Sequence, residues 1–133
     1  MAKSEKQKLK LLYIIQCLME KTDEEHAVTT QEIIDYLALQ GITAERKSIY
    51  TDIDLLIDFG MDIIKNPGRS GGYTLASRQF ELAELKLLVD AVQSSKFITT
   101  KKSRELIGKL ETLCSKYEAT QLHRQVVVTN RNK

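Results

Sequence analysis

Apolar residues recur at helical spacing through the first sixty positions, in three short stretches separated by polar turns. The first stretch runs from about Glu5 to Glu20, and its apolar residues repeat at i, i+3, i+4 and i+7: Leu11, Ile14, Ile15 and Leu18. This spacing places all four on one face of an α-helix, where they can pack against a core. The polar sequence KTDEEHAV that follows predicts a loop.

The second stretch, TTQEIIDYLAL, begins with a helix-capping signature. Thr29 and Glu32 stand three residues apart, which is the spacing of a capping box. Its core face consists of Ile33, Ile34 and Leu37. Gly41 follows at the position where a glycine commonly ends a helix. The pattern therefore predicts a second short helix with defined ends.

The third stretch, TAERKSIYTDIDLL, has two unlike faces. Thr43 is a plausible N-cap and Gly60 ends the pattern. At 100° per residue, one face collects the apolar residues Ile49, Ile53, Leu56 and Ile57. The first turns carry the polar residues Arg46, Lys47, Ser48, Tyr50 and Thr51. Three short helices joined by tight turns are the ground plan of a helix-turn-helix domain.

Two short β-like runs, DIIK and GYTLA, come directly after the third helix. The segment from Asn66 to Gly72, which joins them, contains the only proline of the chain and three of its six glycines. These features predict a two-stranded hairpin, the wing of a winged helix. The polar groups that such a wing could offer to a phosphate backbone are Lys65, Asn66, Arg69 and Ser70.

The character of the chain changes after Ser77. FELAELKLLVDAVQSS is apolar on two stripes, and a helix that is apolar nearly all round must be covered from both sides. A second helix is predicted over TTKKSRELIGKLETLCSKY, and HRQVVVTN is predicted as a lone strand. We therefore expect a winged helix-turn-helix in residues 1–77, linker helices that could form a homodimer in 78–120, and the start of a further domain in 121–133.

Composition narrows the class of protein. No apolar run reaches the ~18–20 residues that a membrane span requires, and no signal peptide is recognisable. Cys17 and Cys114 lie far apart inside apolar helical patterns, which predicts buried free thiols rather than a disulfide or a metal site. We expect a cytoplasmic protein.

Charge is segregated along the chain although the net charge is only +2. Six acids stand against one lysine between Glu20 and Asp35, whereas eight basic residues stand against three acids from Lys101 onward. Basic stretches of this kind suit an anionic partner such as nucleic acid, although ordinary solvated faces give the same numbers.

Candidate catalytic groups are missing from the sequence. His26 and His123 have no second metal ligand nearby, and the GRSGG loop lacks the Gly-Lys-Ser/Thr ending of a phosphate-binding P-loop. No nucleophile stands beside a base, and no carboxylates form a cluster. We expect no enzyme, no metal and no cofactor.

Four segments together resemble a known family. TDEEHAVTTQEIIDYL, RKSIYTDIDLLIDFGMDI, GGYTL and FELAELKLLVDAVQSSKFIT are similar, in order and spacing, to the N-terminal part of the bacterial WYL-domain transcriptional regulators. The similarity covers roughly residues 8–115. It implies a mainly α fold with a small two-stranded wing, namely a winged helix-turn-helix followed by a helical linker. It also implies double-stranded DNA as partner, and an effector, if any, bound by a C-terminal sensor domain.

This chain departs from the family pattern at several points. Ser48 stands for the usual threonine, Thr51 stands where arginine is frequent, and Ala27 replaces an expected proline. The Trp-Tyr-Leu element of the sensor domain does not occur, since the sequence has no tryptophan.

In a helix-turn-helix the second helix of the motif enters the major groove with its N-terminal residues against base edges. We expect Lys47, Ser48 and Thr51 to read bases, and Arg46 and Tyr50 to meet the backbone. Thr29 and Thr30, at a helix N-terminus, could contact a phosphate or could simply cap the helix. The alternative function is a protein-interaction winged helix that never touches DNA.

The aspartates behind these front turns would repel phosphate if they faced it. Asp52 lies near the apolar face and is expected to pair with a neighbouring basic residue, which would hold the helix in place. Asp54 lies nearer the exposed face. Only the front half of this helix is therefore expected to enter a groove.

Overall fold

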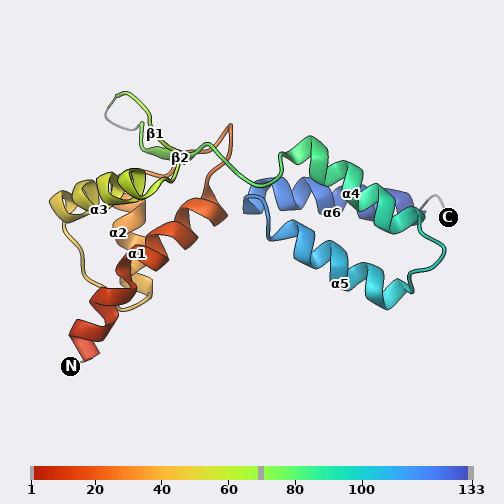
Figure 1. The fold of residues 1–133 in the computed structure, drawn as a ribbon, viewed down its shortest axis with the longest axis horizontal. Helices are drawn as coiled ribbons and strands as arrows, with labels where there is room; N and C mark the ends of the chain where they lie inside the picture. Colours follow the sequence, from red (N-terminus) through yellow and green to blue (C-terminus); the bar gives the residue numbers. More distant parts are fainter. Residues whose placement is uncertain (1, 69–70, 132–133) are drawn as a thin grey trace. The chain divides into compact units, whose positions relative to one another are not determined.

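The computed structural model describes the backbone of residues 2–68 and 71–131, and the side chains of 6–68 and 71–126. Within these residues the chain forms two compact units, 1–77 and 78–133, which are described separately (Figure 1). The first unit contains α1 (Ala2–Lys21), α2 (Thr30–Leu39), α3 (Arg46–Phe59), β1 (Ile63–Lys65) and β2 (Tyr73–Leu75). The predicted mainly α fold with a small two-stranded wing is confirmed.

The core of the first unit lies where α1, α2 and α3 meet. Its fully buried side chains include Ile14, Leu18, Ile33, Leu37, Ile49 and Ile53. Thr22 ends α1 and is also fully buried. Its hydroxyl donates to the Leu18 carbonyl at 2.7 Å and accepts from the Leu75 amide at 3.0 Å. The Thr22 side chain therefore caps the last turn of α1 and links this helix to β2.

Helix α2 begins with the predicted capping box. The Thr29 hydroxyl accepts from the Glu32 amide at 3.1 Å, and the Glu32 carboxylate accepts from the Thr29 amide at 3.0 Å. Gly41, with φ of +80°, follows the helix in the left-handed region that glycine tolerates best. Both predicted ends of this helix are confirmed.

The N-cap of α3 differs from the prediction. Thr43 is not the cap, because the helix begins at Arg46 and Glu45 occupies the cap position. Residues 42–45 are not helical; in this segment Ile42 is buried in the core, and the Thr43 carbonyl accepts from the Gln7 side chain of α1 at 3.5 Å. The far end is as expected, since Gly60 closes the helix with φ of +124°.

The wing is the hairpin formed by strands β1 and β2. Strands β1 and β2 are antiparallel, with Ile63 opposite Leu75 and Lys65 opposite Tyr73. Val28, from the loop before α2, makes a further bridge to Tyr73 with backbone bonds of 2.9 and 2.7 Å. These bonds therefore attach the wing to the loop that precedes α2.

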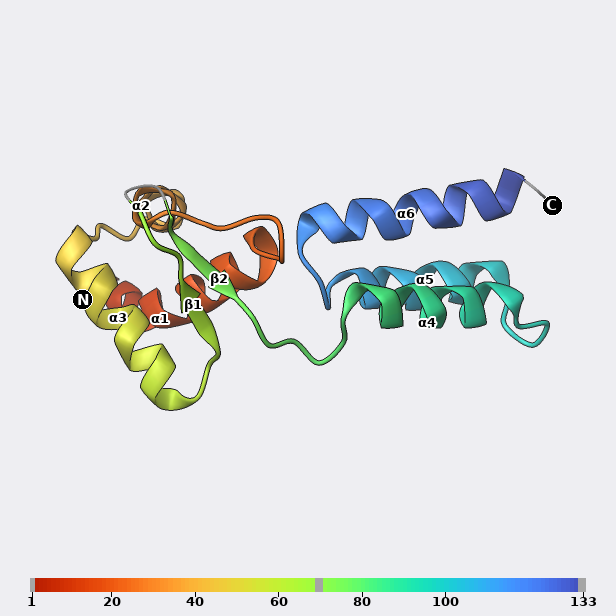
Figure 2. The ribbon, with the colours of Figure 1, turned by 90° about the horizontal axis from the view of Figure 1, so that it is seen from above.

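The second unit consists of α4 (Leu82–Ser94), α5 (Thr100–Glu111) and α6 (Lys116–Arg131), each in contact with the other two (Figure 2). Its buried core is formed by Leu85, Val89, Ile107, Cys114 and Leu122. Of the two apolar stripes predicted for α4, the one containing Leu85 and Val89 is buried, whereas Leu87 on the other stripe is 70% exposed.

The predicted strand HRQVVVTN is wrong, because these residues belong to α6. Ala119, Leu122 and Val126 repeat at helical spacing and pack against the core of the second unit. The run of valines is typical of a strand, but packing outweighs that preference. A start signal was also present, because the Ser115 hydroxyl accepts from the Glu118 amide at 3.1 Å, the first half of a capping box.

Candidate nucleic-acid interface

The front turns of α3 (Arg46–Thr51) present polar side chains to solvent while the opposite side of the helix is fixed in the core. Arg46, Lys47 and Thr51 are exposed, and Tyr50 is 47% exposed. Ile49 between them is fully buried. The helix is therefore held by its apolar face, and its first turns project hydrogen-bonding groups outward.

Ser48 is placed differently from the other residues of the front turns. It is only partly exposed, its hydroxyl donates to the Glu45 carbonyl at 2.9 Å, and it accepts from the Lys10 ammonium at 2.8 Å. The same ammonium lies 2.8 Å from Asp52 Oδ2. The expectation that Asp52 pairs with a basic residue and holds the helix is confirmed, and the partner lies on α1.

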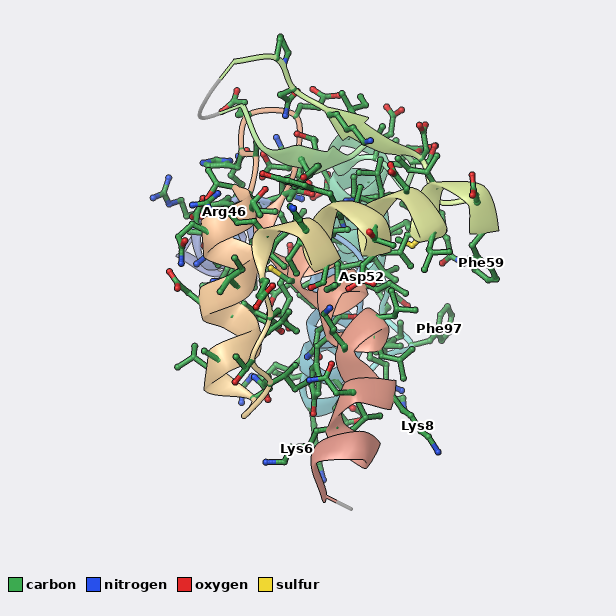
Figure 3. All side chains as sticks on the ribbon, turned by 90° about the vertical axis from the view of Figure 1, so that its left-hand side faces the viewer. Lys6, Lys8, Arg46, Asp52, Phe59 and Phe97 are labelled. Carbon is green, nitrogen blue, oxygen red and sulfur yellow. The ribbon has the colours of Figure 1, made fainter. Side chains whose placement is uncertain are left out.

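Arg46 meets a neutral partner on α2. Its guanidinium donates to the Gln31 side chain at 3.1 Å, and Figure 3 shows it beside the first turn of α2. The prediction for this residue was a contact with the phosphate backbone. Because Gln31 is uncharged, the positive charge of Arg46 stays available to an anion at this surface.

The hydroxyls at the start of α2 both have partners within the chain. Thr29 caps the helix through the Glu32 amide. The Thr30 and Tyr73 hydroxyls lie 3.3 Å apart, a hydrogen bond between α2 and the wing. These contacts give both threonines a structural role at this helix end.

In the wing, Lys65 and Asn66 are also engaged. The Lys65 ammonium donates to Asp54 Oδ1 at 2.6 Å, and this bond raises the pKa of Lys65. The Asn66 amide donates to the Thr74 hydroxyl at 2.9 Å. Lys65 therefore neutralises the carboxylate that was expected to oppose a groove-bound α3. Arg69 and Ser70, also predicted for the wing, lie outside the described residues.

Two further features of the α3 surface bear on what it can bind. Asp58, one turn beyond Asp54, is exposed. Leu55 and Phe59 are also exposed, by 51% and 83%, and the Phe59 ring points into solvent at the end of the helix (Figure 3). The rear of α3 is thus acidic and apolar, whereas its front is basic and polar.

Lys10 and Gln31 contribute to this site, and sequence reasoning missed both. The signal for Lys10 was its register, because it precedes Ile14 by four residues and so lies on the apolar stripe of α1. A charged residue on a core-facing stripe commonly has a partner there. Gln31 gave no such signal, since an exposed glutamine in a first helical turn is ordinary.

Within the described ranges, no three His, Cys, Asp or Glu side chains gather as metal ligands would. No helix of this part of the chain is long and apolar enough to cross a membrane.

The fold and the site define a winged-helix unit whose exposed polar turns lie at the start of its third helix. Residues 12–68, from α1 into the wing, match the family model described as FokI, D3 domain. The match covers less than half of the chain and suggests a winged-helix-like DNA-binding module. Comparison with curated proteins and with solved structures gave no significant match.

Proposed function

We propose that the chain is a sequence-specific DNA-binding protein that places the front turns of α3 in the major groove. One observation carries the proposal: Lys47, Tyr50 and Thr51 project from a helix whose other face is fixed in the core. The match of residues 12–68 to the FokI D3 domain supports a DNA-binding module. The resemblance to WYL-domain regulators supports a bacterial, cytoplasmic transcriptional regulator that performs no catalysis.

The distribution of charge decides which part of α3 enters the groove. Lys47 and Arg46 lie at the front, and Asp58 lies in the last turns, where it would repel phosphate. Asp54 is neutralised by Lys65. The Thr51 hydroxyl donates its proton to the Lys47 carbonyl at 3.1 Å, so this exposed side chain offers a base its lone pairs and its methyl group. We therefore place base contacts on Lys47 and Thr51, and backbone contacts on Arg46, Tyr50 and the wing.

The test begins with selection of duplexes from a random library by the parent protein, followed by anisotropy titrations on the selected and a scrambled duplex. Lys47→Ala and Thr51→Ala should each reduce discrimination between the two duplexes by about tenfold, the scale of one good base contact. Asp58→Ala, on the rear of the same helix, is the matched control and should leave discrimination unchanged. Parent-like discrimination in both front variants would exclude the groove assignment.

A second candidate function, a protein-interaction module, is favoured by the exposed apolar residues of α3. Tyr50, Leu55 and Phe59 are large and exposed, and residues 1–77 carry nine Lys and Arg against twelve Asp and Glu, a formal charge of −3. Retention on heparin at low and high salt separates the two candidates. Salt-sensitive retention supports DNA binding, and passage without retention supports a protein partner.

We also propose a homodimer through the second unit. Ala83, Leu87 and Ala91 lie on one face of α4 and are all exposed, Leu87 by 70%, so this apolar stripe is uncovered among the described residues. Regulators with one winged helix per chain commonly pair two of them on half-sites about one DNA turn apart. An effector, as in the WYL-domain regulators, would act through a sensor domain and not through the units described above.

A further inference from the structure

Lys10 lies on α1, but both polar contacts of its ammonium group are on α3. Nζ lies 2.8 Å from Ser48 Oγ and 2.8 Å from Asp52 Oδ2. The side chains of Lys10 and Asp52 are only 11% and 14% exposed. Among the described residues no other group donates to Asp52 Oδ2, so Lys10 is the partner of this oxygen. The pair is therefore largely removed from solvent, where charges interact more strongly than on an open surface.

The hydroxyl of Ser48 is committed to this arrangement. A serine hydroxyl has one proton to donate and two lone pairs. Its proton goes to the Glu45 carbonyl, and one lone pair accepts from Lys10. No proton is left for a base acceptor. Ser48 thus joins the two helices, although its position in the front turns first suggested that it reads bases.

Neighbouring contacts brace the same end of α3. The Gln7 side-chain amide donates to the Thr43 carbonyl at 3.5 Å, so α1 also holds the loop that leads into the helix. On the other side, Arg46 is bonded to Gln31 of α2. The front turns of α3 are therefore fixed from both flanking helices, and Lys10 is the only charged group in this brace that reaches two α3 side chains among the described residues.

We propose that Lys10 is a positioning residue for sequence reading: it sets the rotation and height of α3 through Ser48 and Asp52 without touching DNA. The inference rests on the proposed function. Base contacts tolerate errors of only about 0.5 Å, so a loosened helix loses discrimination before it loses attraction to phosphates. The pair also holds the Asp52 charge against α1, which reduces its repulsion of a bound duplex.

The experiment compares Lys10→Met with Lys8→Met in the full chain. Methionine keeps most of the length of the lysine stem and removes the charge. Lys8 is exposed, two residues away on the same helix, and points into solvent (Figure 3), which makes it a matched control. The probes are the duplex selected by the parent protein and a scrambled duplex of the same length. Lys10→Met should lower the ratio of their affinities at least fivefold, and change the affinity for the scrambled duplex less than twofold. Lys8→Met should leave the ratio unchanged.

A second pair of variants separates positioning from simple loss of stability. Ile33→Val loosens the core at α2 and leaves the polar contacts of α3 in place. Ile33→Val should keep the parent's ratio of affinities for the selected and the scrambled duplex, measured at a temperature where all variants are folded. Adding Asp52→Asn to Lys10→Met should recover part of the ratio, because no buried carboxylate is then left without its cation. A parent-like ratio in Lys10→Met, or an equal loss in Ile33→Val, overturns the proposal.

If the parent protein selects no duplex, the proposed function fails and the positioning role is judged from hydrogen exchange. The amides of residues 50–53 should then exchange at least tenfold faster in Lys10→Met than in Lys8→Met. Equal exchange in the two variants overturns the anchoring of α3 by Lys10.

Discussion

Substitution of Thr29 separates two roles of its hydroxyl at the start of α2, capping of the helix and contact with DNA. The hydroxyl already accepts the Glu32 amide, and loss of an N-cap costs about 1 kcal/mol. Thr29→Ala should therefore lower the free energy of unfolding by about that amount in urea titrations, and Thr29→Ser should keep it. If Thr29→Ala keeps full stability but binds DNA more weakly, the hydroxyl belongs to the interface.

The Cys17 thiol provides a prediction of pH dependence. Burial raises the pKa of this thiol to about 11, and nearby Lys21 opposes the shift only in part. In a Cys114→Ser background, a disulfide reagent at pH 8 should label Cys17 only after urea unfolds the chain, because the thiolate is the reactive form. Labelling of the folded protein at the rate of a free cysteine would contradict the buried position.

The same shift in the pKa of Cys17 sets the direction in which the stability of the protein changes with pH. The pKa of the Cys17 thiol is higher in the folded than in the unfolded chain. The contribution of the neutral thiol to the stability of the folded state is therefore fully present below the ordinary thiol pKa of 9.0. It is lost as pH rises from there to about 11. Stability measured across this range should decline more in the parent than in Cys17→Ala.

At the residue scale, sequence reasoning identified groups whose local spacing is diagnostic. Thr29 and Glu32 form their capping box because both partners lie within one helical turn. The Lys65–Asp54 and Arg46–Gln31 contacts join residues eleven and fifteen positions apart on different elements. Such pairs depend on how the elements pack, so the sequence predicts the residues but not their partners.

At the scale of the elements, the wing requires a glycine at position 72, where any other residue would add a Cβ. Gly72 has φ of +65°, and a Cβ there would overlap the Val28 carbonyl that bridges to Tyr73. Gly72→Ala should therefore lower the free energy of unfolding by ~2 kcal/mol or more, from backbone strain and steric overlap together.

Gly60 is the matched control for this prediction. It also has a positive φ, +124°, but a Cβ there meets nothing within 4 Å. Gly60→Ala should introduce backbone strain without steric overlap. It should therefore lower the free energy of unfolding less than Gly72→Ala does in the same thermal or urea unfolding experiment. Equal costs would mean that the close approach of Val28 does not constrain the wing.

Helices were predictable where apolar periodicity and end signals agreed, as in α2. The start of α3 was misplaced because residues 42–45 make contacts with other elements, among them the bond of the Thr43 carbonyl to Gln7, that local cap preferences do not reveal. The HRQVVVTN segment was misassigned because its valines favour a strand, whereas Ala119, Leu122 and Val126 share a helical face that packs on the second core.

For the whole molecule, positive charge is not concentrated in the winged-helix unit. Residues 1–77 have a formal charge of −3, and residues 78–133 carry eleven Lys and Arg against six Asp and Glu, or +5. In the front of α3 the exposed cations are Arg46 and Lys47, and in the wing Lys65 is paired with Asp54.

A shallow salt dependence of DNA binding follows from this distribution. Two or three neutralised phosphates per winged helix give a slope of log K against log salt of about −2 to −3. Anisotropy titrations between low and moderate salt measure it. A slope of about −6 or steeper per chain would mean that cations outside this face, including those of residues 78–133, also contact the backbone.

The proposed homodimer is tested by the mass of the chain in solution. Sedimentation at tens of micromolar should give twice the chain mass for the parent, and Leu87→Ser should shift the population toward the single chain because it removes an exposed apolar contact. A single-chain mass for the parent excludes a dimer of these 133 residues.

The central claim, that the front turns of α3 meet DNA, is tested most directly by mapping amide chemical-shift changes as a selected duplex is added to the labelled protein. We expect the largest changes at residues 46–51 and in the wing, with small changes at residues 55–59. Changes confined to residues 55–59 or to the second unit, or none at saturating duplex, would contradict it.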